Sequence, residues 1–340
     1  MKKWLKNIFA LFFGLGMAVL LLEIFLRFYN PLNTRFTNGE IKLPANIVYK
    51  IDNTEISQLP LKITHSKNSL GFRGQEISDT SGRVKIICIG GSTTECFYLS
   101  DGQDWPAVWQ ASLGKKYWVN NAGLDGHSSF GHLVLLQNHI VNLKPKYVVF
   151  LVGCNDVAAS EINNYEKEFL QGQKRWLEYS EIFNAISAIK RAKKAKDFGI
   201  HHQSIKLTEQ SIVDTTDWNQ KPNSAKLFEY KQRLEKLVNT CIKAGITPIF
   251  CSQPSILSAK EINGVFVGNR NFQGESAMHY AFKLKQFNNM TKDVCIENHL
   301  QFIDLENRLK PLPIYYYDFF HYTPEGADAI AKILSEDIHI

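Results

Sequence analysis

The stretch VKIICIGGSTTE (residues 84–95) decides the fold of this chain. Its apolar, β-branched opening ends in two glycines, a pattern typical of a buried strand followed by a tight turn. Similar runs recur downstream as YWVNNAG (117–123), KYVVFLVG (146–153), ITPIFCSQ (246–253) and, more weakly, HLQFIDL (299–305). We therefore expect a sheet of five buried strands.

Segments with a helical pattern alternate with these strands. They cover roughly residues 104–114, 129–143, 224–244, 276–298 and 324–338. Thr323 has the side chain of an N-cap and Pro324 suits the first helical position, so the last helix is expected to begin there. This alternation predicts a three-layer α/β/α domain with a mostly parallel, flavodoxin-like sheet. We expect the domain to cover residues 81–340.

Two segments depart from this alternation. Residues 29–80 show no sustained period and include the turn-rich NSLGFRG (68–74), so we expect an irregular lead-in. Residues of about 160–222 are charged and aromatic and are interpreted as an inserted excursion. A basic patch within it is either a solvated face or a surface for anionic lipid or glycan. The patch consists of Lys190, Arg191, Lys193, Lys194 and Lys196.

The N-terminal segment IFALFFGLGMAVLLLEIFL (8–26) is apolar except for Glu23. At about 1.5 Å per residue, a helix of this length spans a hydrocarbon core of about 30 Å. Residues 1–28 are therefore expected to form a short tail and a transmembrane anchor. A cleaved signal peptide fits less well, because the apolar stretch is long and no small-residue cleavage site follows it. A buried core helix is the other alternative.

Charges on either side of this segment indicate its orientation. Arg27 alone follows it closely, whereas several lysines precede it, so the positive-inside rule places the tail in the cytoplasm. The body of the chain would then be periplasmic or at the cell surface. Within a wider window Arg35 and Lys42 also follow the segment, so the numbers of positive charges before and after it become equal. The preceding lysines are Lys2, Lys3 and Lys6.

Composition excludes several classes of protein. With 340 residues and 44% hydrophobic content the chain is not disordered. Its net charge of +6 is spread along the sequence, so nucleic acid is not expected as a partner. The cysteines form no CxxC pair, which speaks against a zinc or redox site. In an oxidising compartment a disulfide such as Cys241 with Cys295 is possible.

Polar groups follow the predicted strands where ligands bind in parallel α/β sheets. After the first strand, glycines allow a sharp turn and Ser92 begins a helix with its N–H free to face an anion. Read alone, this is a catalytic nucleophile, a helix cap or a phosphate-binding turn. It lacks the Gly-Lys pair of a Walker loop and the second glycine of G-x-S-x-G.

Three further places carry polar groups. Gly123 follows the second strand, and its backbone N–H could donate to an oxyanion. Asn155 and Asp156 follow the third strand, where a side-chain amide could donate or form an Asx turn. Asp318 precedes His321 by three residues and could orient its imidazole, although the two could also be metal ligands or an ion pair. No third ligand cluster stands out among His127, His132, His201 and His202.

Taken together, these four places resemble the SGNH (GDSL-like) hydrolase family in order and spacing. The resemblance covers roughly residues 84–338. It implies Ser92 as nucleophile, with Asp318 and His321 completing its triad. It also implies that Gly153, Asn155 and Asp156 form the family's G-x-N-D block. Gly91 stands where the GDS motif has aspartate. Membrane-anchored bacterial members with a Gly-Gly-Ser-Thr block and an NSLGFRG lead-in also look similar to this chain.

The resemblance implies a serine esterase that needs no cofactor or metal. Its oxyanion hole would combine the backbone N–H groups of Ser92 and Gly123 with the amide of Asn155. With the outward orientation, acyl groups such as O-acetyl esters on a surface or secreted glycan are the expected substrate. The alternatives are an O-acyltransferase with the same triad and a catalytically silent glycan-binding or assembly protein.

Overall fold

The structure is a computed structural model that describes residues 2–29, 36–37, 40–158, 179–186, 189, 202, 204, 212, 224–272 and 274–340. The chain divides into two compact units. The N-terminal unit comprises Met1–Lys42 and Asn163–His201, and the sheet unit comprises Leu43–Ile162 and His202–Ile340. His201 and the basic patch lie outside the described residues.

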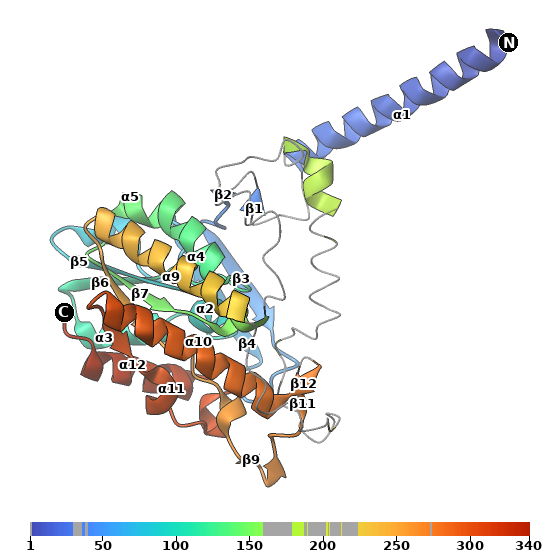
Figure 1. Cartoon of the computed structure of the whole chain (residues 1–340). Coiled ribbons are helices and arrows are strands. Elements are labelled where there is room, and N and C mark those ends of the chain that lie inside the picture. Colours follow the sequence, from blue (N-terminus) through green and yellow to red (C-terminus); the bar gives the residue numbers. More distant parts are fainter. Residues whose placement is uncertain are drawn as a thin grey trace. The chain divides into compact units, whose positions relative to one another are not determined.

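The five predicted strands form one parallel sheet in the sheet unit (Figure 1). Their order is β13-β8-β7-β5-β6, which confirms the flavodoxin-like topology. In this order β5 lies between β6 and β7. The chain first leads from β5 to β6 on one side and then crosses back to β7 on the other side. The direction of strand order therefore reverses at the carboxyl end of β5, which is the switch point of the sheet. The strands are β5 (Val84–Gly90), β6 (Tyr117–Asn121), β7 (Tyr147–Leu151), β8 (Thr247–Cys251) and β13 (Gln301–Ile303).

Helices cover both faces of this sheet (Figure 1). Right-handed crossovers place the helix between β5 and β6 on one face and those of the later crossovers on the other. Accordingly, α3 packs on α12, whereas α9 packs on α4 and α10. Thr323 caps α12 as predicted, because its hydroxyl accepts a hydrogen bond from Gly326 N at 3.2 Å. The helices are α3 (Trp105–Leu113), α4 (Ser129–Leu135), α9 (Ser224–Lys243), α10 (Ala277–Glu297) and α12 (Pro324–Asp337).

The predicted helix 129–143 changes pitch inside its span. After α4 a π-helical turn, η2 (Leu136–Ile140), leads into α5 (Val141–Leu143). Shorter elements connect the main ones. They are α2 (Ser92–Glu95), α6 (Cys154–Ala158), η5 (Ile256–Ser258), β9 (Glu261–Ile262), β10 (Val265–Phe266), β11 (Asn271–Phe272), β12 (Glu275–Ser276), α11 (Leu305–Arg308) and η6 (Pro313–Tyr315).

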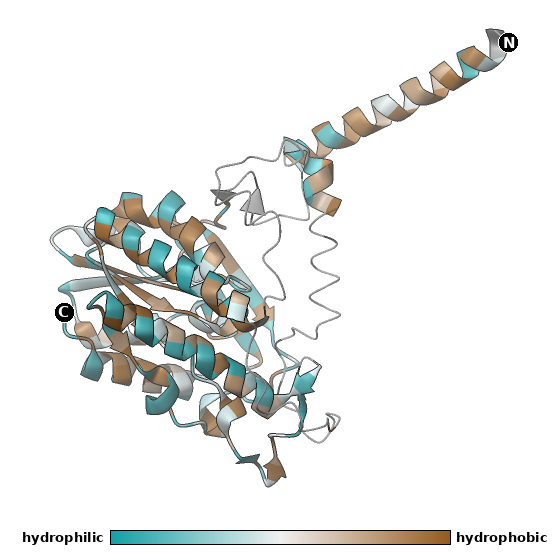
Figure 2. Ribbon diagram, viewed as in Figure 1, coloured by the Kyte–Doolittle hydropathy of each residue, from teal (hydrophilic) through white to brown (hydrophobic). Residues whose placement is uncertain are grey.

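The core lies between the sheet and its helices. Ile86, Ile87 and Ile89 of β5 are fully buried, because a strand covered on both faces has no side that meets water. The helices are hydrophobic toward the sheet and hydrophilic elsewhere, so both colours alternate along α9 and α10 (Figure 2). All six cysteines are free thiols, so the considered bond between Cys241 and Cys295 is not formed.

Residues 43–80 contain regular structure where we expected an irregular lead-in. An antiparallel hairpin pairs β3 (Ile47–Asp52) with β4 (Lys62–Lys67), and η1 (Ile77–Thr80) follows. The inward positions of β4 include His65 and Lys67 as well as Ile63, so the usual alternation of apolar and polar residues is absent. Arg73 then pairs with Asn121 in an isolated antiparallel bridge at the edge of the main sheet.

The N-terminal unit contains α1 (Lys2–Phe28) and a short pair of strands, β1 (Phe36–Thr37) and β2 (Glu40–Ile41). Trp4–Phe28 is long and apolar enough to cross a membrane, and Figure 2 shows it as largely hydrophobic. Glu23 forms an ion pair with Arg27 at 3.1 Å. Its carboxylate also accepts hydrogen bonds from Ser180 Oγ at 2.9 Å and from Glu181 N at 2.8 Å.

Candidate active site

Ser92 is the first residue of α2 and is separated from the end of β5 by Gly91 alone. It lies at the switch point of the sheet and is 8% exposed. Gly90 and Gly91 are required here by space. A side chain at Gly90 would collide with Thr94, and a Cβ at Gly91 would lie 2.5 Å from Nδ2 of Asn155. The two glycines thus let the chain turn tightly from the strand into the helix that presents Ser92.

Asp318 and His321 lie in the loop between η6 and α12. An antiparallel bridge between Tyr316 and Tyr322 closes the base of this loop. Asp318 Oδ1 accepts hydrogen bonds from the backbone N–H groups of Phe320 and His321, at 2.9 and 2.7 Å. Its other oxygen, Oδ2, lies 2.6 Å from Nδ1 of His321. The carboxylate therefore fixes both the turn and the imidazole ring.

The opposite ring nitrogen of His321, Nε2, lies 2.7 Å from Oγ of Ser92. With Nδ1–H donating to Asp318, Nε2 is the nitrogen that accepts a hydrogen bond from the Ser92 hydroxyl. The structure thus brings Ser92, His321 and Asp318 together in a continuous hydrogen-bonded chain.

Asp318 and His321 each stabilise the charged form of the other. Burial disfavours both charged forms, yet the adjacent His321 imidazole and its hydrogen bonds lower the pKa of Asp318 below its ordinary value. Burial likewise acts against the imidazolium form of His321, but the Asp318 carboxylate outweighs it and raises the pKa of His321 above 6.5. The imidazole is therefore a stronger base than a free histidine side chain.

Gly123 and Asn155 approach Ser92 from the ends of β6 and β7. The backbone of Gly123 packs so closely on α2 that any side chain would collide with Glu95 N. Its N–H donates to Oδ1 of Asn121 at 2.9 Å, so an incoming oxygen would share this donor. The Asn155 amide donates one N–H to the His127 carbonyl at 2.9 Å. Its second N–H is the one that a ligand could engage.

Asp156 lies next to Asn155 but faces the protein interior. Its carboxylate accepts hydrogen bonds from Ser129 N and Oγ and pairs with Arg233 at 3.2 Å. Burial raises the pKa of Asp156 despite the nearby guanidinium. Asp156 therefore holds α6 against α4 and is not part of the hydrogen-bonded chain at Ser92.

Sequence comparison relates most of the sheet unit to a known protein family. The family profile of the GDSL-like Lipase/Acylhydrolase family matches residues 88–329, from β5 into α12. The chain belongs to this family. Membership of a lipase and acylhydrolase family makes this chain an ester hydrolase. No curated protein matches the chain.

Several solved structures are similar to this GDSL-like hydrolase in fold. The acetyl xylan esterase AlAXEase is 15% identical, with a TM-score of 0.46, and the match covers 75% of this chain and 100% of that chain. The acetylxylan esterase Axe2 from Geobacillus stearothermophilus is 16% identical, with a TM-score of 0.45 and coverages of 75% and 94%. A GDSL-like lipase from Bacteroides thetaiotaomicron is 15% identical, with a TM-score of 0.42 and coverages of 77% and 90%.

His202 lies beside the hydrolase's hydrogen-bonded chain, which the sequence did not indicate. Its ring centroid is 4.1 Å from that of His321, and Nδ1 lies 2.8 Å from the Tyr317 hydroxyl. One donor atom each from His202, Asp318 and His321 lie within 4.8 Å of one another, a set that a metal ion could use. Both ring nitrogens of His321 are already engaged by Asp318 and Ser92 in this structure.

Gln253, two residues after the end of β8 in the GDSL-like domain, is a second residue that sequence reasoning missed. Its side chain accepts a hydrogen bond from Thr93 Oγ1 at 3.0 Å and donates one to the Tyr322 hydroxyl at 3.0 Å. It therefore connects the neighbour of Ser92 to the neighbour of His321. Its position at the end of a strand was the available signal, but a lone glutamine suggests no chemistry.

Proposed function

We propose that Ser92, His321 and Asp318 are a catalytic triad that cleaves an ester. The observation that carries the proposal is the chain from Ser92 Oγ through His321 to Asp318, with successive distances of 2.7 and 2.6 Å. His321 accepts the Ser92 proton while Oγ attacks the ester carbonyl, and Asp318 stabilises the imidazolium that forms. His321 then gives this proton to the departing alcohol, which leaves an acyl group on Ser92.

The second half of the reaction repeats the first with water. His321 removes a proton from water, the hydroxide attacks the acyl-serine carbonyl, and the proton returns to Ser92 Oγ as the acid leaves. In both halves a negative oxygen forms. Its proposed donors are the N–H groups of Ser92 and Gly123 and the amide of Asn155, and one such donor is worth about 3 kcal/mol of transition-state stabilisation.

A fluorophosphonate probe tests the triad, because it reacts with an activated serine and needs no knowledge of the natural ester. We expect it to label the wild-type protein and to leave the Ser92→Ala variant unlabelled. The control is Ser57→Ala, because Ser57 is an exposed serine. Ser129→Ala would not be a suitable control, because the Ser129 hydroxyl donates a hydrogen bond to the buried Asp156 carboxylate. Labelling of folded Ser92→Ala would refute the assignment.

The proposed substrate is an acyl ester, such as an O-acetyl group, on a surface or secreted glycan. An outward-facing anchored hydrolase meets such esters, whereas the triad itself accepts any reachable acyl group. An O-acyltransferase would use the same acyl-serine and replace water with a sugar hydroxyl. Product analysis with an acetyl donor, with and without an oligosaccharide, separates the two: free acetate in both samples indicates the esterase.

We also propose that α1 is a retained membrane anchor with the hydrolase domain outside the cytoplasm. The contacts of Glu23 support retention, because cleavage after α1 would remove the carboxylate that accepts hydrogen bonds from residues 180 and 181. The protein should remain in membranes after alkaline carbonate extraction. Protease added to intact cells or spheroplasts should degrade the domain, and protection from the protease would reverse the proposed orientation.

A further inference from the structure

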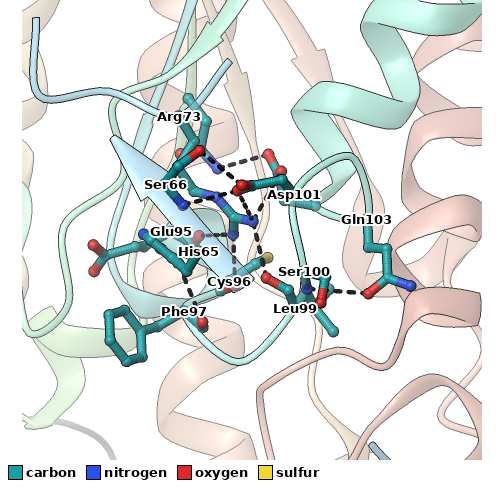
Figure 3. A network of polar contacts seen from close by, with 12 residues as sticks. His65, Ser66, Arg73, Glu95, Cys96, Phe97, Leu99, Ser100, Asp101 and Gln103 are labelled. Atoms are coloured by element: carbon teal, nitrogen blue, oxygen red, sulfur yellow. Dashed lines mark hydrogen bonds and ion pairs between the residues drawn. The ribbon is translucent and has the colours of Figure 1, made fainter. Parts of the chain in front are cut away.

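Arg73 belongs to the NSLGFRG motif, which the triad does not use. It is 2% exposed although it carries a permanent charge, and a buried guanidinium requires several well-placed partners. Figure 3 shows these partners: the side chain points at the end of α2 and the loop that follows it. α2 is the helix that begins with Ser92.

Arg73 binds the carbonyl groups at the end of this helix. Nη1 donates to the carbonyls of Glu95 and Cys96 at 2.8 and 2.7 Å, and Nη2 donates to the carbonyl of Leu99 at 2.9 Å. The last carbonyls of any helix lack partners within the helix and carry partial negative charge. A helix as short as α2 holds itself together poorly, so these bonds fix its axis from the C-terminal end.

Two carboxylates balance the charge of Arg73. Asp101 and Asp104 each place an oxygen 3.5 Å from Nη2. These carboxylates compensate the charge of the buried guanidinium. Arg73 contacts α2 at its C-terminal end, whereas Ser92 begins this helix at the other end.

Lys67, six positions before Arg73, binds the last side chain of the same helix, that of Glu95. Its Nζ lies 2.8 Å from Oε1 of Glu95, and both side chains are at most 2% exposed. The other oxygen of Glu95 accepts a hydrogen bond from Asp125 N at 2.7 Å. Glu95 thus links α2 to the loop after Gly123.

The backbone of Arg73 also holds the end of β6. Arg73 and Asn121 exchange two backbone hydrogen bonds of 2.9 Å. The Asn121 amide donates to the Thr94 carbonyl at 2.6 Å, and its Oδ1 accepts from Gly123 N. Arg73 therefore binds both backbone segments whose N–H groups we assign to the oxyanion hole: α2 through its side chain and the end of β6 through its backbone.

We propose that Arg73 is a positioning residue for the oxyanion hole: it holds α2 and the end of β6 in the register that aims the Ser92 and Gly123 N–H groups at one oxygen. This inference rests on the proposed triad. Small displacements matter for such donors, because a shift of about 1 Å can cost about 100-fold in rate. Arg73 would act on the transition state and have little effect on ground-state binding.

The test compares Arg73→Lys with Arg83→Lys in the full-length, detergent-solubilised protein. Lysine keeps the charge but cannot donate to three carbonyls in the fixed geometry of a guanidinium. Arg83 is a matched control, because its Nε also donates to a backbone carbonyl, that of Tyr117 at 2.9 Å, but at the start of β6. Hydrolysis of p-nitrophenyl acetate, inhibition by a trifluoromethyl ketone and thermal melting are measured for each.

For Arg73→Lys we expect kcat to fall 10- to 100-fold with KM changed less than threefold, and the ketone to bind weaker by a similar factor. This loss is smaller than that of a whole donor, because the donors are displaced and not removed. Arg83→Lys should keep kcat within twofold. The inference is overturned if Arg73→Lys keeps wild-type kcat. It is also overturned if both variants lose kcat in proportion to the decrease in their melting temperatures.

If Arg73→Lys does not fold, Glu95→Gln decides, because it keeps the shape of the side chain and removes its ion pair with Lys67. We expect about a tenfold lower kcat at unchanged KM. An unchanged kcat would overturn the inference, because it would show that fastening the C-terminal end of α2 does not affect the rate. Failure of the proposed triad is distinguishable from failure of this inference. If a fluorophosphonate does not label the wild type, the proposed triad is refuted. If it labels the wild type and the two arginine variants have the same kcat, only the proposed role of Arg73 is refuted.

Discussion

Nε2 of His321 lies 2.7 Å from Oγ of Ser92, although 229 positions separate the two residues in the chain. The parallel sheet explains this proximity. Ser92 follows a central strand, and the loop before α12 returns to the same edge of the sheet, because carboxyl ends of parallel strands share one edge. In the proposed mechanism this contact makes the ionisation of His321 the property that controls the rate.

The pH dependence should follow the raised pKa of His321. Burial opposes the imidazolium form but the Asp318 carboxylate prevails, so the base becomes protonated at a pH above 6.5. Activity is therefore expected to fall as the pH decreases through a value above 6.5. In Asp318→Asn this limb should move to lower pH, and kcat should drop by about 10⁴-fold. A kcat/KM profile of both proteins checks this, and an unmoved limb would contradict it.

Asn155→Ala should lower kcat by about 100- to 1,000-fold, because one oxyanion donor is lost. KM should change little. Asn142→Ala is the matched control, since the exposed Asn142 amide bonds only locally, to the Asn138 carbonyl at 3.3 Å. Steady-state kinetics and melting curves of both variants are compared. Equal activities of the two variants would remove Asn155 from the proposed oxyanion hole.

Restoring the aspartate of the GDS motif at Gly91 should damage this hydrolase. A Cβ there would lie 2.5 Å from Nδ2 of Asn155, so the amide must move away from Ser92. We expect Gly91→Asp to lower kcat by about 100-fold. In an Asn155→Ala background the same substitution should cost much less, because the displaced group is already absent. Additive losses in this double-mutant cycle would show that Gly91 acts in another way.

His132 should make the stability of the domain depend on pH. Burial lowers the pKa of His132 to about 3, although the interaction of its ring N–H with the Gly90 backbone carbonyl acts in the opposite direction and raises it. The unfolded chain binds a proton below about pH 6.5, so this stability is complete above that value and is lost as the pH falls toward 3. Between pH 8 and 5 the loss should be about 2 kcal/mol. Urea unfolding of wild type and His132→Gln measures it, and equal pH dependence would contradict it.

The fold was predictable because each strand and helix has its own local pattern. The run at 84–91 is apolar on both faces, as a central parallel strand must be, and Thr323 with Pro324 marks the start of α12. The hairpin of β3 and β4 was missed for a physical reason. Lys67 faces inward to meet Glu95, and this pairing is invisible until both residues are placed.

The site was predictable where residues follow strands or lie close in sequence. Asp318 and His321 are three positions apart, so their contact follows from a single turn. His202 was missed because it lies in the charged excursion, where no periodicity indicates its position. Gln253 and Arg73 act through backbone and hydroxyl groups of other segments, and such contacts require the tertiary structure.

The hydrogen bonds of Glu23 have a consequence for the synthesis of the protein. Ser180 is 157 positions later in the chain, and ribosomes add about 5–20 residues per second, so roughly 8–30 seconds pass before the partner of Glu23 exists. If α1 is the anchor proposed above, it enters the bilayer during this interval with its Glu23 carboxylate paired to Arg27 and without those later partners. A nascent chain that has not reached Ser180 therefore carries a Glu23 carboxylate without the hydrogen bonds that it accepts in the folded protein.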